Sequence, residues 1–190
     1  MNFKDLVLKN RSQRTYDESR KITREELVSL VELARISPSA ANRQPLKYFL
    51  SCDEKTNAII QPMTAWGGSL PELHLPPQGH RPTAFIVILV DKTVTPDPRH
   101  AEKDVGIVAQ TMLLGAAEMG LSGCMIGAFK PALKDALVLP ENLEITLVVA
   151  FGKGEEEIEI VDAADSVKYY RDGAGKHYVP KRTLDELIVK

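Results

Sequence analysis

The sequence predicts one domain, spanning residues 1–190, in which helices are combined with buried β-strands. Residues 84–90 and 145–151 are apolar and rich in β-branched side chains, which is typical of strands buried on both faces. Thr23 and Glu26 form a capping box at the start of a helical apolar repeat. With 190 residues that are 44% apolar, the chain is large enough for a single core.

Composition limits the partners that we expect. The 24 Lys and Arg residues nearly balance the 26 Asp and Glu residues, so bulk charge favours no nucleic acid and no anionic membrane. The opening segment MNFKDLVLKN is too polar for a signal peptide, and the run 84–90 is too short to cross a bilayer. We therefore expect a cytoplasmic protein without a membrane partner.

Cysteine and histidine spacing gives no support for a metal. Cys52 and Cys124 lie in separate apolar stretches, so we expect two buried, reduced thiols. The histidines show no HxH or HExxH pattern and lie in loop-like sequence, which predicts surface positions for His74, His80, His100 and His177.

In the first half of the chain, apolar spacing and capping residues predict helices over 2–10, 24–36 and 54–62, and a strand over 47–52. Residues 63–82 are rich in Gly and Pro, so we expect a long irregular excursion. Trp66 in this segment either covers a flat ligand or anchors the loop by packing. The sequence leaves both possibilities open.

In the second half, the same rules predict helices over 99–119, from 130 or 131 to 138, and after Thr183, and strands over 124–126 and 145–151. Residues 155–159 are expected to form a solvated acidic turn, 173–175 a glycine-rich turn, and 177–182 an extended segment. The helix 99–119 is apolar enough to be either a hidden core helix or a dimer interface.

The loop 37–45, SPSAANRQP, follows one predicted helix and precedes a predicted strand. Its prolines fix the backbone, and its hydroxyl and carboxamide groups are expected to face outward. Such a surface suits a polar heteroaromatic ring better than a phosphate or a metal. The alternative is that Ser and Asn simply cap a turn.

Basic residues occur near both ends of the chain. Arg11, Ser12 and Arg14 place two guanidinium groups and a hydroxyl on one short turn, which suits a phosphate monoester. Lys181 and Arg182 provide a second basic pair. The alternative is a solvated basic turn. Because no GxGxxG, Walker, HExxH or GxSxG motif is present, the remaining groups favour a phosphorylated flat cofactor.

Four motifs together resemble the FMN-dependent nitroreductase family. They are RSQRTYD at 11–17, SPSAANRQP at 37–45, DVGIVAQTMLLGAAEMGLSGCMIGAF at 104–129 and HYVPKR at 177–182. The resemblance implies an α+β fold with a central mixed or antiparallel sheet flanked by helices. It also implies an intertwined homodimer with two FMN molecules at the subunit interface, to which the helix 99–119 would largely belong.

The resemblance also implies roles for individual residues. Arg11, Ser12 and Arg14 match positions that contact the FMN phosphate, ribityl chain and pyrimidine edge, and Lys181 and Arg182 would close the phosphate site. Pro38, Ser39, Ala40 and Asn42 match the partner-chain loop across the isoalloxazine, with Gln44 near its polar edge, and Ile126 and Gly127 match backbone near N5 and O4. Many members of the family have an arginine where this chain has Asn10, so we expect weaker binding of the phosphate.

The implied activity is that of an FMN-dependent NAD(P)H oxidoreductase. NADH or NADPH would reduce the flavin at N5 in a ping-pong cycle, and a nitroaromatic, quinone or similar electron-poor ring would accept the hydride. Arg14 is the candidate for stabilising the reduced flavin. One alternative is another flavin reaction, ring oxidation or dehalogenation, which residues 63–82 would decide. The others are a flavin-binding redox module with little turnover and an anion-binding interaction protein.

Overall fold

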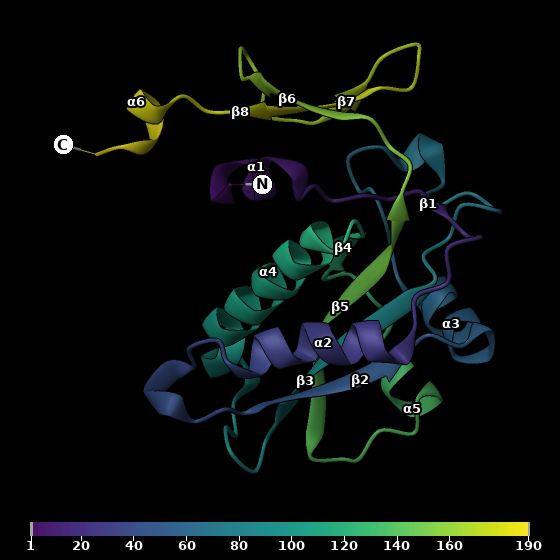
Figure 1. Ribbon diagram of the computed structural model, residues 1–190. Helices are drawn as coiled ribbons and strands as arrows, with labels where there is room; N and C mark the ends of the chain where they lie inside the picture. The colour runs from purple at the N-terminus through teal and green to yellow at the C-terminus, as the bar shows by residue number, and fades with distance from the viewer. Residues whose placement is uncertain (1, 190) are drawn as a thin grey trace.

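A computed structural model describes residues 2–189, and its centre is an antiparallel sheet with helices on both faces (Figure 1). The strand order is β1-β5-β3-β2, and β4 also pairs with β5. The strands are β1 (Tyr16–Asp17), β2 (Leu46–Ser51), β3 (Ala84–Asp91), β4 (Ser122–Ile126) and β5 (Leu143–Gly154). The expected α+β class with a central antiparallel sheet is confirmed.

A second, smaller sheet is formed by the C-terminal part of the chain. It has the order β6-β8-β7, with β6 (Ile158–Asp162) parallel to β8 (His177–Lys181) and β7 (Tyr170–Arg171) antiparallel to β8. In Figure 1 this sheet lies on the side of α1 that is opposite to α4. The helices are α1 (Phe3–Lys9), α2 (Arg24–Arg35), α3 (Glu54–Ile60), α4 (Glu102–Glu118), α5 (Leu133–Ala136) and α6 (Leu184–Leu187).

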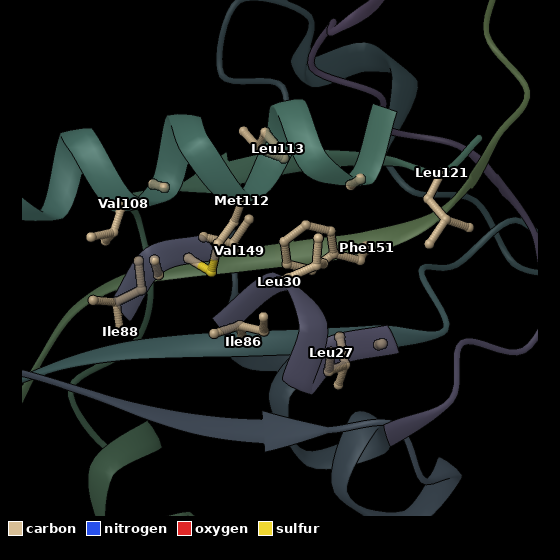
Figure 2. Packing of buried hydrophobic residues seen from close by; sticks show 14 of the residues in the cluster. Leu27, Leu30, Ile86, Ile88, Val108, Met112, Leu113, Leu121, Val149 and Phe151 are labelled. Carbon is tan, nitrogen blue, oxygen red and sulfur yellow. The ribbon is translucent and has the colours of Figure 1, made fainter. Parts of the chain in front are cut away.

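Strand β3 is the centre of the core, because it pairs with β2 on one side and β5 on the other. Successive side chains of a strand point to opposite faces. Ile86 and Ile88 therefore pack against α2 and α4, as Figure 2 shows, whereas Phe85 and Val87 pack in a second cluster with residues of α3 and α5. The prediction of a strand buried on both faces is confirmed.

The predicted helix starts are confirmed by their caps. The Thr23 hydroxyl accepts the Glu26 N–H at 3.2 Å, and the Glu26 carboxylate accepts the Thr23 N–H at 2.9 Å. Asn2 caps α1 through the Asp5 N–H at 2.9 Å, and Thr183 caps α6. Each cap satisfies backbone donors that a helix start leaves without partners.

Helix α4 lies mainly in the core of its own chain. Nine of its residues are buried: Asp104, Val105, Val108, Ala109, Met112, Leu113, Gly115, Ala116 and Ala117. A β-carbon at Gly115 would lie 2.3 Å from Leu33 Cδ1, so the glycine permits the close contact between α4 and α2. Ile107 remains 41% exposed on the opposite face. The helix therefore serves largely as a core element, with one exposed stripe.

Two predictions for the end of β5 are wrong. The strand was expected to end before Gly152 but continues to Gly154, where it pairs with Tyr16. The side chains of Tyr16 and Gln13 pack over the two glycines, and β-carbons there would lie within 2.6 Å of them. The expected acidic turn at 155–159 instead leads into β6, which begins at Ile158.

The predictions for cysteine and histidine hold in part. Cys124 is buried, whereas Cys52 is only half-buried, and neither forms a disulfide. His177 was expected on the surface, but its side chain is 1% exposed. The prediction failed because His177 belongs to strand β8 and lines the pocket between the small sheet and α4, a tertiary effect that loop-like composition does not reveal.

Gly123 offers a test of the packing between β4 and β5. A β-carbon there would lie 2.6 Å from the carbonyl oxygen of Ala150, which is backbone and cannot move aside alone. We expect Gly123→Ala to lower the free energy of unfolding by about 1–3 kcal/mol. Urea denaturation would measure the change. Gly173→Ala is the matched control, because a β-carbon added at Gly173 would have nothing within 4 Å, and equal stability of both variants would contradict this account.

Candidate functional site

The segment after α1 is held along the edge of β4. The Gln13 N–H donates to the Gly123 carbonyl at 3.1 Å, and Ser12 forms a bridge with Gly123. The Gln13 side chain makes two further bonds with the backbone of Glu156, through Nε2 at 3.1 Å and Oε1 at 2.9 Å. These contacts fix the backbone that presents Arg11, Ser12 and Arg14.

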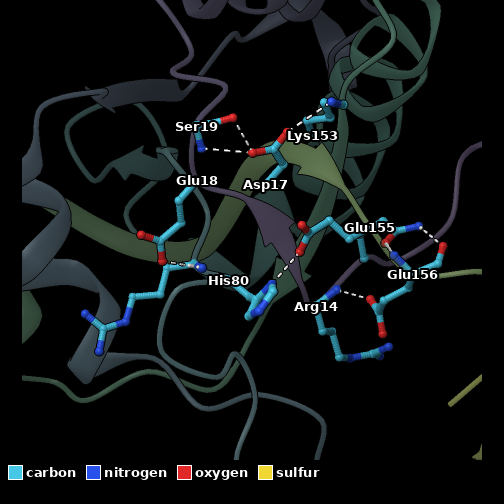
Figure 3. A network of polar contacts seen from close by, with 10 residues as sticks. Arg14, Asp17, Glu18, Ser19, His80, Lys153, Glu155 and Glu156 are labelled. Atoms are coloured by element: carbon cyan, nitrogen blue, oxygen red, sulfur yellow. Dashed lines mark hydrogen bonds and ion pairs between the residues drawn. The ribbon is translucent and has the colours of Figure 1, made fainter.

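Glu156 is a buried carboxylate that joins this segment to the small sheet. Its side chain is 3% exposed and forms an ion pair with Arg171 of β7. It also accepts the backbone N–H of Arg14, as Figure 3 shows. Two more exposed pairs lie near this junction, His80 with Glu155 and Lys153 with Asp17.

Strand β8 contributes one face to the same region. His177, Val179 and Lys181 alternate along the strand, so their side chains share a face. All three line a pocket of about 310 Å³ between the small sheet and α4. The complete lining is Asn10, Arg11, Ser12, Arg14, Gln110, Leu113, Met125, Ile158, Tyr169, His177, Val179 and Lys181.

The pocket has an excess of positive charge and contains unpaired polar atoms. Among residues 2–189, the buried Nε of Arg11 and Nδ1 of His177 have no hydrogen-bond partner. Arg11 is oriented by a bond from Nη2 to the Val7 carbonyl at 2.7 Å, and burial lowers the pKa of its guanidinium. Unpaired buried donors are costly, so the Arg11 Nε suits an anionic or polar ligand.

Arg14 is held by an aromatic ring rather than by an acid. Its guanidinium carbon lies 4.8 Å from the centre of the Tyr169 ring, and Nη1 donates to the Ser12 carbonyl at 3.2 Å. Within the described residues, the side chain has no ion pair. Its charge is therefore available to a ligand in the pocket.

The structure brings together some of the predicted site residues. Arg11, Ser12, Arg14 and Lys181 line one pocket. Ile126 and Gly127 follow Met125 directly at the end of β4, so they lie beside that pocket without lining it.

Arg182 does not line the pocket. Its side chain is exposed and interacts with Glu186 of α6 at 3.4 Å. Consecutive residues of an extended segment point in opposite directions, which separates Arg182 from Lys181.

The polar loop 37–45 lies near the other end of α4. The Ser39 hydroxyl donates to Asp104 Oδ2 at 2.6 Å, and the Ala40 N–H donates to Asp104 Oδ1 at 3.0 Å. The Gln44 N–H donates to the Ser39 hydroxyl at 3.0 Å. The two serine hydroxyls are thus used within the chain, which corrects the expectation that the hydroxyls face outward. Asn42 and Gln44 are exposed and bonded to each other.

The backbone of this loop is strained. Ala41, Asn42 and Gln44 have φ values of 50°, 53° and 52°, in the left-handed region that residues other than glycine rarely adopt. Such conformations concentrate at functional sites. Pro38, Ser39 and Gln44 line a separate apolar pocket of about 380 Å³ together with Asp104 and Val108. The loop and the basic pocket are therefore two separate features of one chain.

Three residues that line the basic pocket were given no role from the sequence. Gln110 and Met125 lie within the motif at 104–129, whereas Tyr169 lies outside all four motifs. His177 and Val179 were detectable, because the extended HYVPKR segment has a period of two and Lys181 was already assigned. The ion pair between Glu156 and Arg171 could not be predicted from sequence, because strand β6 and a loop separate the two residues along the chain.

Residues 2–189 contain no helix long and apolar enough to cross a membrane. The same residues contain no group of three or more His, Cys, Asp or Glu side chains arranged to hold a metal ion.

A comparison with protein families identifies the class of this fold. Residues 7–153 match the model of the nitroreductase family, and the chain belongs to that family. A protein from Archaeoglobus fulgidus, provisionally named NADH dehydrogenase/NAD(P)H nitroreductase, is 25% identical over 166 residues, which are 84% of this chain and 90% of the relative.

Solved structures show the same fold. A nitroreductase family protein from Clostridium difficile 630 superposes with a TM-score of 0.66 and 26% identity, covering 82% of this chain and 86% of that one. A protein from Exiguobacterium sibiricum 255-15, provisionally called a nitroreductase and solved in complex with FMN, has a TM-score of 0.66 and 18% identity, covering 82% and 90%.

His177 predicts a specific pH dependence of stability. Burial and the nearby Arg14 and Arg171 lower its pKa to about 4. As pH falls from about 6.5 to about 4, the unfolded chain binds a proton that the folded chain does not bind, so stability falls by up to about 1.4 kcal/mol per pH unit. We expect His177→Gln to remove this contribution, measured by urea unfolding between pH 7 and pH 4. The exposed His100→Gln is the control, and a slope unchanged by His177→Gln would refute the assignment.

Proposed function

We propose that this chain is an FMN-dependent NAD(P)H oxidoreductase that reduces a nitroaromatic, quinone or similar electron-poor ring. The observation that carries the proposal is the convergence of Arg11, Ser12, Arg14 and Lys181 on one pocket. The FMN complex of the Exiguobacterium protein and the name of the Archaeoglobus relative support the choice of cofactor and reductant.

The residues present fit a phosphorylated flavin. Arg11 offers a buried Nε donor without a partner, and Lys181 adds a second positive charge at the same pocket. Arginine donates to phosphate oxygens through a planar fork, which fixes orientation as well as affinity. We assign Arg11, Ser12 and Lys181 to the phosphate and ribityl chain.

Bound FMN would supply hydride transfer between the nicotinamide and the acceptor. Arg14 would then hold positive charge near the pyrimidine edge, and this charge favours the anionic reduced state. Burial raises the pKa of the Cys124 thiol to about 11, so this neighbour of the pocket remains protonated and adds no competing charge. The backbone of Ile126 and Gly127 is assigned to the N5 side.

We further propose that a second copy of the chain completes the site. Asp104, which anchors the loop 37–45, and Leu113, which lines the basic pocket, are nine residues apart on α4. This separation corresponds to about 14 Å along the helix, so the loop 37–45 and the basic pocket lie apart within one chain. The pocket of about 310 Å³ is also near the lower limit of typical ligand sites. Pro38, Ser39, Ala40, Asn42 and Gln44 are assigned to the partner's flavin.

A spectrum tests the proposal. We expect purified protein, or protein reconstituted with FMN, to show flavin absorbance that bleaches when NADH or NADPH is added without oxygen. Addition of a nitroaromatic or quinone should restore the colour. Protein that neither contains FMN nor binds it would refute the proposal.

Arg14 gives a more specific test. We expect Arg14→Ala to weaken FMN binding by about 10- to 100-fold, because a hydrogen bond from a charged donor contributes about 1.5–3 kcal/mol. Flavin reduction by NAD(P)H should also be slower. Fluorescence titration and stopped-flow absorbance measure the two effects. The exposed Arg24→Ala is the control, and wild-type values for Arg14→Ala would remove Arg14 from the site.

A further inference from the structure

Tyr169 contacts three parts of the chain that are distant in sequence. Its hydroxyl accepts the backbone N–H of Ser69 at 3.2 Å. Its ring lies beneath the Arg14 guanidinium, 4.8 Å from centroid to carbon, and 5.3 Å from the centre of the His177 ring. Because Tyr169 also lines the basic pocket, these contacts join the pocket wall to the loop 63–82.

The hydrogen bonds between the loop 63–82 and the rest of the described chain lie mainly at the two ends of the loop. The Lys130 N–H donates to the Met63 carbonyl at 2.8 Å, and the Ala65 N–H donates to the Ala128 carbonyl at 2.8 Å. At the other end, the Tyr16 N–H donates to the His80 carbonyl at 3.0 Å. In the middle of the loop, Trp66 packs against the second core cluster and lies edge-on to Tyr16, with ring centroids 6.4 Å apart.

The middle of the loop, residues 66–79, has a single hydrogen bond to another part of the described chain, from Ser69 to Tyr169. The same stretch lies against Arg14, since a β-carbon built on Gly67 would be 3.8 Å from Arg14 Cδ. The middle of the loop therefore contacts the pocket wall at two adjacent points. The Ser69 N–H bonds to the Tyr169 hydroxyl, and Gly67 lies next to the aliphatic part of the Arg14 side chain.

The Tyr169 ring also contacts the ring of His177. The imidazole is buried, and its lowered pKa keeps it neutral at pH 7, so it does not compete with Arg14 for the ring. The ring is therefore in contact with both the Arg14 guanidinium and the buried His177 imidazole, and these contacts limit its rotation. Its hydroxyl is therefore presented to Ser69 in a fixed direction.

We propose that Tyr169 is a positioning residue that couples the loop 63–82 to the cofactor pocket. The ring positions Arg14, and the hydroxyl positions Ser69. A ligand that binds the Arg14 guanidinium therefore also orders the middle of the loop. The tether itself is independent of the proposed function. Its consequence, a loop ordered by FMN and shaped for the acceptor, rests on that function.

Tyr169→Phe tests the coupling because it removes the hydroxyl and keeps the ring beneath Arg14. Hydrogen exchange at the Ser69 amide, with and without FMN, is the direct readout. In Tyr169→Phe we expect this exchange to be about fivefold faster than in wild type, because the Ser69 amide loses one ordinary hydrogen bond. FMN should slow this exchange in wild type and have little effect in the variant.

Kinetics gives a second readout on the loaded enzyme. With the enzyme saturated with FMN, we expect Tyr169→Phe to raise KM for the acceptor by more than it changes the rate of flavin reduction by NAD(P)H. Tyr170→Phe is the matched control, because Tyr170 stacks on Tyr178 at 5.1 Å and does not line the pocket.

The possible outcomes separate this inference from the proposed function. Equal Ser69 exchange in wild type and Tyr169→Phe, or equal slowing of both by FMN, would overturn the coupling. If wild type binds no FMN, the proposed function fails. Faster exchange in the variant alone would then still support the tether, and equal exchange would overturn it.

Discussion

A buried carboxylate, Glu156, holds together the two ends of the chain that form the basic pocket. It pairs with Arg171 of the small sheet and accepts the Arg14 N–H, while its backbone exchanges hydrogen bonds with the Gln13 side chain. Removal of one partner from a buried ion pair costs about 3–5 kcal/mol. This junction therefore holds the backbone of Arg14 and the strand β7, which follows Tyr169, on one carboxylate.

The central fold could be predicted from sequence because its signals are local. The capping box at Thr23 and Glu26 and the apolar run that forms β3 each specify their element without reference to distant residues. The end of β5 and the strand β6 could not be predicted in this way. Strand β5 continues to Gly154 because β1 pairs with it, and the acidic run after it contacts Arg171 and leads into β6, which pairs with β8. Tertiary contacts decide both cases.

In the candidate site, too, some residues could be predicted from local sequence and others depend on tertiary contacts. The residue types that suit a phosphate pointed to Arg11, Arg14 and Lys181, and the structure brings them together. Arg182 was assigned together with Lys181 from the HYVPKR motif, but the alternation of an extended segment directs its side chain to solvent. His177 was misplaced on the surface because composition alone does not reveal the packing of β8. The strained loop after Ser39 retains its predicted role as a proposal, now with Asp104 as its anchor.

The central claim is that the basic pocket recognises the phosphate of a flavin, and comparison of FMN with riboflavin tests it most directly. The two ligands share the ring and the ribityl chain and differ only in the phosphate. Titration of flavin-free protein with each should give FMN affinity at least about 100-fold higher, since two charged hydrogen bonds contribute about 3 kcal/mol or more. Equal affinity for both ligands, or no binding of either, would contradict the account.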